Sequence, residues 1–495
     1  LCFACFLPVA VFSQTDDLSK KLDDMINEGM KEWQVPGLTT VVIKDGEVVF
    51  QKAYGVKNLK SQEAVNNKTL FAMASTTKAL VAIAMAMLVE EGKMEWTDKV
   101  RDHLPSFRLS DAYITETARV QELLTHNLGI GGANYLWLID SVSADETFKR
   151  FADAPIVYPV RGGFIYQNLN YVAAGQLIES VSGQDWRTFV QENVLDRLEM
   201  GRTQTLSANI FKAGNYVTPH YNHLFEGMME VDYTNMDQIG PAGMIWSCLD
   251  DVTNYITFLE NDGVYKGDTL LKPASFDYLF KPHALIPGEE YPTQRLVNPN
   301  WMSYGLGWFQ QDYRGQKLDF HTGSLPGLVA LAGLMRDKNV AVYVFGNLDH
   351  AELRHAILYK AMDLYAFGDD SRDWHTEVFD LYNGLFDDYK KGIENMVMGR
   401  VADTRPSLSL DEYAGEYINK MYGTIVVENK KGALHLSVND RLHFSVDHWH
   451  YDTFFRERVG TSFLLYPDTF DFDIDKSGKV SSMNIFGFEW KKMNE

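Results

Sequence analysis

Phe71-Ala-Met-Ala-Ser75-Thr-Thr-Lys78-Ala-Leu-Val-Ala-Ile-Ala-Met-Ala-Met-Leu88 places a serine three positions before a lysine, at the start of an apolar run. Residues i and i+3 share one helical face, so the lysine amine can reach the serine hydroxyl. A serine hydroxyl needs a base beside it to act as a nucleophile, and a lysine serves when burial lowers its pKa. The stretch therefore predicts a buried helix with Ser75 as nucleophile and Lys78 as its base. In the alternative interpretation, Ser75 caps the helix and Lys78 is solvated.

Length and charge limit the classes of function. The chain has 495 residues, 45% of them hydrophobic, and a formal net charge of −21. This length allows two or three domains with a large core. The negative charge disfavours nucleic acid and anionic membrane surfaces as partners, which leaves a small molecule or a peptide as the expected substrate. Beyond the N-terminus, no stretch reaches the roughly 18 apolar residues that a membrane span needs.

The N-terminus is apolar from Leu1 to Phe12 and continues with Ser13-Gln14. This pattern is typical of the end of a signal peptide, so we interpret residues 1–13 as its remnant and predict a secreted or periplasmic protein. A buried N-terminal strand is the alternative. Once the signal is removed, Cys248 is the single cysteine left, so no intramolecular disulfide is expected.

Strand and helix patterns predict an α+β domain over residues 14–400. Apolar positions recur with helical spacing near the N-terminus, a hairpin signal follows at Lys44-Asp-Gly-Glu47, and the middle of the chain is helical. Short strands rich in apolar and aromatic residues then precede two more helices. This order favours an antiparallel sheet flanked by helices, with an inserted helical subdomain. The expected helices are 16–33, 351–366 and 374–398, and the expected strands are 38–43, 48–53, 307–311, 317–321, 329–335 and 340–345.

A second, all-β domain is expected over residues 405–495. Arg405-Pro406 is typical of a linker, and strands then recur about every ten residues between polar turns. The pattern indicates a small antiparallel barrel or sandwich. Three of its expected strands are 424–427, 433–438 and 463–466. His448 and His450 alternate on one strand, but a metal site needs at least one more ligand, so no metal is predicted.

Two further motifs are candidates for the same site. Tyr166-Gln-Asn168 lies where a polar loop enters a helix, although Tyr233-Thr-Asn235 and Tyr417-Ile-Asn419 have the same spacing. A serine-lysine hydrolase also needs an oxyanion hole and a strand that holds the substrate. His321-Thr-Gly323 fits such a strand, because glycine allows a close approach of backbone. Its rival, Lys476-Ser-Gly478, reads as a polar hairpin turn.

The three motifs resemble, in order and approximate separation, those of the serine β-lactamase and penicillin-binding protein family. The likeness is strongest to its class C-like branch, which includes D-amino-acid peptidases and β-lactamase-like esterases, and it covers roughly residues 20–365. The C-terminal module resembles the lipocalin-like β domain of some secreted members. Supporting stretches are Glu122-Leu-Leu-Thr-His126-Asn-Leu-Gly129, Gly240-Pro-Ala-Gly243 and Tyr304-Gly-Leu-Gly-Trp308.

The resemblance implies a role for each residue. Ser75 is the acylated nucleophile, Lys78 takes its proton, and Tyr166 is the general base that also protonates the leaving group. Asn168 binds the substrate amide, and the amides of Ser75 and Ser324 form the oxyanion hole. Nearby cationic groups are expected to lower the pKa of Tyr166 from about 10. Neither a metal nor a cofactor is implied.

One departure affects the expected substrate. Many β-lactamases have a lysine where this chain has His321, and a histidine is largely neutral at pH 7, so it clamps a substrate carboxylate poorly. We therefore expect a secreted serine hydrolase that acts on D-amino-acid peptides or small esters, with His321, Gly323 and Ser324 lining the substrate. The alternatives are a catalytically silent protein that binds cell-wall peptides, and a β-lactamase. His126 is expected to be a hydrogen-bonded structural histidine, and Cys248 a buried small residue.

Overall fold

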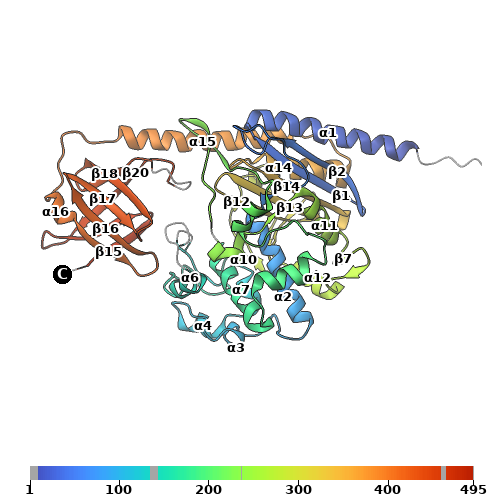
Figure 1. Cartoon of the computed structure of the whole chain (residues 1–495), viewed down its shortest axis with the longest axis horizontal. Coiled ribbons are helices and arrows are strands. Elements are labelled where there is room, and N and C mark those ends of the chain that lie inside the picture. The colour runs from blue at the N-terminus through green and yellow to red at the C-terminus, as the bar shows by residue number, and fades with distance from the viewer. Residues whose placement is uncertain (1–8, 134–135, 137–142, 236, 459–463, 494–495) are drawn as a thin grey trace, which may run out of the picture.

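The structure is a computed structural model that describes residues 9–133, 136, 143–235, 237–458 and 464–493. It consists of a large sheet-and-helix domain and a C-terminal β-barrel, joined by the long helix α15 (Trp374–Met398) (Figure 1). The predicted α+β class with a C-terminal all-β domain is confirmed. Residues 1–8 of the expected signal remnant lie outside the described residues, and 9–13 belong to a helix, so the alternative of an N-terminal strand is wrong for them.

The large domain is built on one antiparallel sheet of eight strands in the order β2-β1-β14-β13-β12-β11-β10-β9. The predicted hairpin is present, because Asp45 and Gly46 adopt positive φ angles of 52° and 79° between its two strands. Of the later strands, the one predicted over 307–311 is shifted by two residues, the one over 317–321 is five residues longer, and the last two are one residue longer than predicted. The strands of the sheet are β1 (Gly37–Lys44), β2 (Glu47–Gly55), β9 (Ala284–Leu285), β10 (Met302–Tyr304), β11 (Phe309–Tyr313), β12 (Gln316–Leu325), β13 (Leu328–Met335) and β14 (Val340–Gly346).

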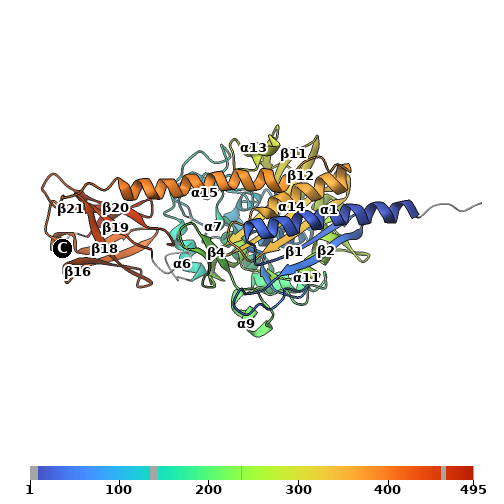
Figure 2. The same ribbon diagram turned by 90° about the horizontal axis from the view of Figure 1, so that it is seen from above.

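Helices cover both faces of this sheet. Side chains alternate across β1, so that Val41 and Ile43 pack into the core below the sheet and Val42 into the core above it. The upper face carries α1 (Val9–Trp33), α14 (Leu353–Met362) and α15, which lie across the strands in Figure 2. Because both faces are buried, the strands read as continuous apolar runs.

The lower face carries the helical subdomain, whose central element is α2. All residues of α2 from Thr77 to Leu88 are buried, as the apolar run predicted. Small strands β3 (Phe71–Ala72) and β6 (Trp246–Ser247) pair beside it. The helices of this region are α2 (Thr77–Glu90), α3 (Val100–His103), α4 (Ala112–Thr117), α6 (Ala144–Phe151), α7 (Asn168–Ser182), α8 (Trp186–Val190), α9 (Ile210–Ala213), α10 (Gly240–Gly243), α11 (Leu249–Glu260) and α12 (Pro273–Leu279). The short helix α13 (Gln294–Val297) packs instead against the core above the sheet, through Leu296 and Val297.

The C-terminal domain is a closed barrel of eight antiparallel strands. Tyr413, Tyr417, Phe454 and Trp490 fill it with buried aromatic rings, so its interior is a packed core. One predicted strand is wrong: Leu464 to Tyr466 form a loop, whose carbonyls accept hydrogen bonds from Arg456, and residue 463 lies outside the described residues. The strands are β15 (Gly415–Asn419), β16 (Gly423–Lys430), β17 (Ala433–Val438), β18 (Leu442–His450), β19 (Thr453–Arg456), β20 (Asp468–Ile474), β21 (Val480–Ile485) and β22 (Phe488–Lys492).

Described residues of the barrel contact the β4–β5 hairpin and the helical subdomain of the large domain. His223, on the hairpin of β4 (His220–His223) and β5 (Gly227–Glu230), makes a hydrogen bond of 3.1 Å to the carbonyl of Leu465. Phe488 of the barrel lies beside Gly132 of the helical subdomain. The barrel therefore contacts both the hairpin and the helical subdomain. In the described part of the chain, no helix is long and apolar enough to cross a membrane.

Candidate active site

Ser75 stands just before α2, on a single 3₁₀ turn (η1, Ala74–Thr76), and is partly exposed. No side chain caps either helix start, so the interpretation of Ser75 as a cap is wrong. Ala74 is buried and has a left-handed φ of 47°, which is unfavourable for alanine. Local backbone strain of this kind is maintained by surrounding structure and recurs at functional sites.

Lys78 is fully buried and faces Ser75. Its Nζ lies 3.1 Å from Ser75 Oγ, 2.8 Å from Asn168 Oδ1 and 2.6 Å from the carbonyl oxygen of Ala242. Burial lowers the pKa of Lys78 well below its usual 10.5, and no carboxylate among the described residues pairs with it. A neutral amine has two N–H donors and one lone pair. In the protonated form Nζ donates to Ser75 Oγ as well as to the Asn168 and Ala242 oxygens. Burial favours loss of one proton, and with the other two donors held by Asn168 and Ala242 the lone pair of the neutral amine would then face the Ser75 hydroxyl.

Tyr166 and Asn168 join this pair from the loop that enters α7. The ring centroid of Tyr166 lies 4.8 Å from Lys78 Nζ. Its hydroxyl is buried, faces Ser75 without full hydrogen-bond geometry, and has no other partner among the described residues. Desolvation raises the pKa of Tyr166 well above 10, and the neighbouring Ser75 hydroxyl offsets this only in part. The expectation of a lowered Tyr166 pKa is therefore wrong, because burial penalises the phenolate.

His126 holds the Tyr166 loop. Its Nδ1 accepts the Gln167 N–H at 3.0 Å, and its carbonyl accepts the Ile165 N–H at 3.0 Å. The ring is buried, lies 4.4 Å from the Tyr166 ring, and sits on backbone with a φ of 57°. The prediction of a hydrogen-bonded structural histidine is confirmed, and its contacts fix the residues on both sides of Tyr166.

The third motif lies on the C-terminal half of β12. Residues 316–320 pair with β11, whereas residues 321–325 pair with β13 alone, which leaves one edge free beside η1. Gly323 is the point of closest approach: a Cβ atom there would lie 2.9 Å from Ala74 Cβ and 3.0 Å from the Ser75 nitrogen. Ser324 follows and is exposed. A free strand edge beside a nucleophile can pair with an extended substrate.

His321 belongs to this strand, but its ring does not face a substrate. The side chain is buried, Nδ1 donates to the Thr322 carbonyl at 2.6 Å, and Nε2 accepts from the Tyr304 hydroxyl at 2.8 Å. Desolvation lowers the pKa of His321 to about 3. The imidazole is therefore neutral, and both its nitrogens are engaged, so it has no polar atom free to clamp a carboxylate.

Sequence reasoning missed two contributors. Ala242 supplies the carbonyl that binds Lys78, and the stretch Gly240-Pro-Ala-Gly243 was its only signal. Arg354, on α14, donates to the Gly323 carbonyl and to Ser324 Oγ, and no spacing motif indicated it.

The rival motifs lie elsewhere. Tyr233 donates to the Val217 carbonyl, Tyr417 is a barrel core residue, and Ser477 bonds Asp475 in a barrel turn. Cys248 is buried, and desolvation raises the pKa of its thiol to about 12.

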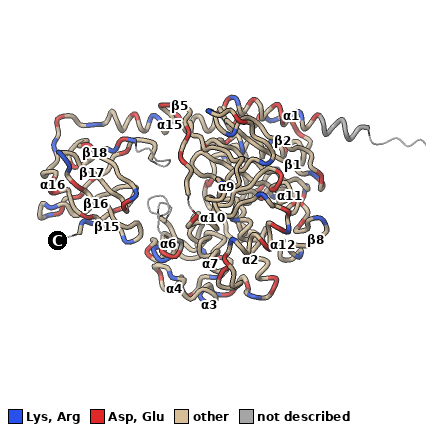
Figure 3. The backbone as a smooth tube through the Cα atoms, viewed as in Figure 1, with Lys and Arg blue, Asp and Glu red and all other residues tan. Residues whose placement is uncertain are grey.

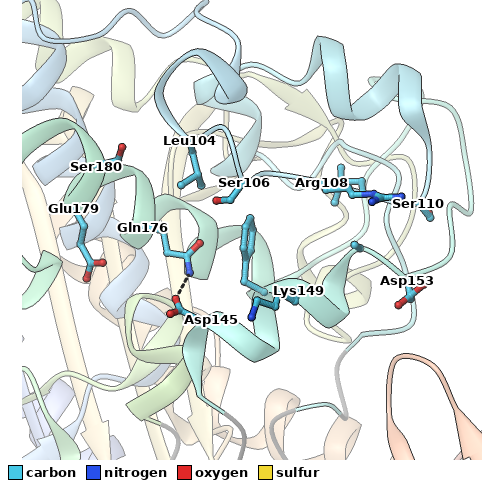
Figure 4. Close-up of a pocket in the computed structure, with 13 residues that line it drawn as sticks. Leu104, Ser106, Arg108, Ser110, Asp145, Lys149, Asp153, Gln176, Glu179 and Ser180 are labelled. Atoms are coloured by element: carbon cyan, nitrogen blue, oxygen red, sulfur yellow. Dashed lines mark hydrogen bonds between the residues drawn. The ribbon is translucent and has the colours of Figure 1, made fainter.

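Neither the distribution of charge nor the cavity drawn in Figure 4 marks this site. In Figure 3 charged residues alternate in sign over the outer helices and loops, and the sheet interior is largely uncharged. A cavity of about 1050 Å³ between α6 and α7 is lined by charged residues of both signs, among them Arg108, Asp145 and Lys149, and contains none of the site residues (Figure 4).

Comparison with known proteins gives a consistent result. The chain is 26% identical over 442 residues to the unguisins hydrolase ungD of Aspergillus violaceofuscus, covering 83% of this chain and 77% of that one. It is 23% identical over 349 residues to protein flp of Staphylococcus aureus, covering 68% of this chain and 64% of flp.

Solved structures share the fold. The octameric penicillin-binding protein homologue from Pyrococcus abyssi aligns with a TM-score of 0.63 at 21% identity, covering 96% of this chain and 99% of that one. SurE aligns with a TM-score of 0.56 at 20% identity, covering 98% and 100%. The family model of a domain of unknown function, DUF3471, matches residues 399–494. The Beta-lactamase family model matches residues 22–367, which include Ser75, Lys78, Tyr166 and the strand at Gly323, and the chain therefore belongs to the Beta-lactamase family.

Proposed function

We propose that this protein is an exported serine hydrolase that cleaves D-amino-acid peptides or small esters through a Ser75 acyl-enzyme. The observation that carries the proposal is the contact of the Lys78 amine with the Ser75 hydroxyl, made by an amine whose pKa is lowered by burial. A protein that only bound its ligand would gain nothing from burying an amine against a serine, because desolvating an ionisable group is costly.

The chemistry follows from this contact. Lys78 takes the Ser75 proton as Oγ attacks the substrate carbonyl, and the developing oxyanion lies at the amides of Ser75 and Ser324. Tyr166 remains a neutral phenol, so in this scheme it donates a proton to the leaving group and is replenished from Lys78. The bond to the leaving amine or alcohol breaks, and water then releases the acyl group from Ser75.

The substrate class follows from what the site offers beside Gly323. Neutral, fully engaged His321 provides no cation for a substrate carboxylate, which favours amide or ester groups without a free carboxylate and disfavours β-lactams. One similar protein is named a hydrolase of unguisins, and a SurE structure, with a TM-score of 0.53, is titled as containing D-Leu, which supports a substrate with a D-residue. Export is proposed from the apolar N-terminus.

Intact-mass spectrometry after mixing with a fluorophosphonate or a penicillin tests the proposal. We expect one fluorophosphonate adduct in the wild type and in Ser477→Ala, a variant in an exposed barrel turn, and none in Ser75→Ala. No adduct in the wild type would favour the silent peptide-binding protein. Rapid turnover of penicillin would favour a β-lactamase. A D-alanyl p-nitroanilide, its L-isomer and a p-nitrophenyl ester then separate a D-residue peptidase, which prefers the D-anilide, from an esterase, which cleaves the ester alone.

A further inference from the structure

Arg354 is a buried cation attached to the back of the substrate strand. Its side chain is 4% exposed, and its Nη1 donates to the carbonyl of Gly323 at 2.5 Å, to Ser324 Oγ at 3.0 Å and to the carbonyl of Ala330 at 3.2 Å. Glu352 holds the other side of the guanidinium through bonds of 3.0 and 3.1 Å. Arg354 thus connects α14 to β12 and β13 at the level of the active site.

The Gly323–Ser324 peptide links this cation to the reaction. All peptide bonds of the described chain are trans, so the Gly323 carbonyl and the Ser324 N–H point in opposite directions from one rigid plane. Arg354 binds the carbonyl and also bonds Ala330 of β13, on the paired side of the strand. The Ser324 N–H must therefore point to the unpaired side, where Gly323 approaches the Ser75 amide.

Charge strengthens this orientation. A hydrogen bond from a cation to a carbonyl is stronger than one from a neutral donor, and it polarises the peptide so that the opposite N–H becomes a better donor. A buried ion pair is weak evidence for stability, because its desolvation cost is comparable to its Coulombic gain. The burial of the Arg354–Glu352 pair, with both side chains 4% exposed, is therefore better explained by the orientation it gives to the Gly323–Ser324 peptide.

We propose that Arg354 is a positioning residue that aims and polarises the Ser324 amide toward the substrate oxyanion, with Glu352 holding the guanidinium in place. The inference rests on the proposed function, because it needs a Ser75 acyl transfer that develops an oxyanion. It adds a residue of α14, outside the three sequence motifs, to the machinery that stabilises the transition state.

The test compares Arg354→Lys with Arg456→Lys, which changes a buried arginine that also donates to backbone carbonyls but lies in the barrel. A lysine keeps the charge and loses the planar fork. We expect Arg354→Lys to lower kcat for a nitrophenyl ester by about 100-fold, the lower end for losing an oxyanion donor, with KM nearly unchanged. Affinity for a boronic acid, whose adduct on Ser75 carries a mimic of the oxyanion, should fall by a similar factor. Arg456→Lys should change neither.

Each outcome decides the question. A kcat loss without a loss of boronic acid affinity would overturn the inference, since misfolding lowers the active fraction but not the affinity of the folded remainder. An equal loss in Ser324→Ala would show that Arg354 acts through the hydroxyl instead. If Arg354→Lys shows no cooperative melt, Glu352→Gln replaces it, with an expected loss of about tenfold in both quantities. A wild type that fails to form any Ser75 adduct refutes the proposed function itself, whereas an active wild type with unaffected variants refutes this inference alone.

Discussion

Gly323→Ala is the sharpest test of the contact between the substrate strand and the nucleophile. The added methyl would lie 2.9 Å from Ala74 Cβ and 3.0 Å from the Ser75 nitrogen, with the Met73 carbonyl oxygen closer still. Ordinary contact begins near 3.4 Å, so strand and turn must separate by roughly half an ångström or more. A misplacement of about 1 Å costs about 100-fold in rate, and half of it costs about tenfold. We expect the rate constant for acylation of Ser75 to fall between tenfold and 100-fold, which corresponds to a rise in activation free energy of about 1.4 to 2.7 kcal/mol.

The assay is the rate of fluorophosphonate labelling of Ser75, which needs no knowledge of the natural substrate. Gly384→Ala is the matched control, because it adds a methyl within α15 where nothing lies within 4 Å, and alanine favours a helix by up to about 1 kcal/mol over glycine. It should label at the wild-type rate. A Gly323→Ala protein that labels within twofold of the wild type would refute the reasoning, because the strand would then not constrain the serine.

Three further results are expected. The labelling rate should rise with pH through a midpoint well below 10.5, because only the neutral Lys78 amine accepts the Ser75 proton. Lys78→Arg should abolish this rise with pH. A midpoint near 10.5 would contradict the role of Lys78 as the base. His126→Asn keeps an acceptor for the Gln167 N–H and tolerates a positive φ, so its kcat should stay within about threefold of the wild type. His126→Ala should lower kcat by at least about tenfold. Equal losses of kcat in the two variants would contradict positioning of Tyr166 through this hydrogen bond. Tyr304→Phe leaves the buried Nε2 of His321 without a donor, so urea unfolding should show a loss of about 1–3 kcal/mol, absent from the exposed control Tyr113→Phe.

Helices and turns whose sequence signal lies within their own segment were predicted well. The helix predicted over residues 374–398 matches α15 at both ends, and Asp45-Gly46 correctly predicts the first hairpin, because these signals lie within the segments themselves. The turn at Ser75 could not be derived in this way. A helix start was expected there, but contacts from Gly323 and Gly243, far away in the sequence, hold η1 and the unusual Ala74 backbone.

The electrostatics of the site were the least predictable part. The sequence shows which charges are present but not how deeply they are buried, so the pKa of Tyr166 was expected to fall, whereas desolvation raises it. His321 was expected on a strand at the site, which is correct, but its bond to Tyr304 depends on the pairing of non-adjacent segments. Arg354 had no motif, and its only local signal is a charge within an otherwise buried helix.

The length of helix α15 sets both the distance and the rotational orientation of the barrel relative to the large domain. Its first residues pack against α14 and α1, and its 25 residues span about 37 Å to the barrel. Each inserted residue would turn everything beyond it by about 100°, which would carry Leu465 and Phe488 away from His223 and Gly132. A change of seven residues restores the direction to within about 20° but shifts the barrel along the axis by about 10 Å. The contacts of the barrel with His223 and Gly132 therefore constrain the number of residues in α15.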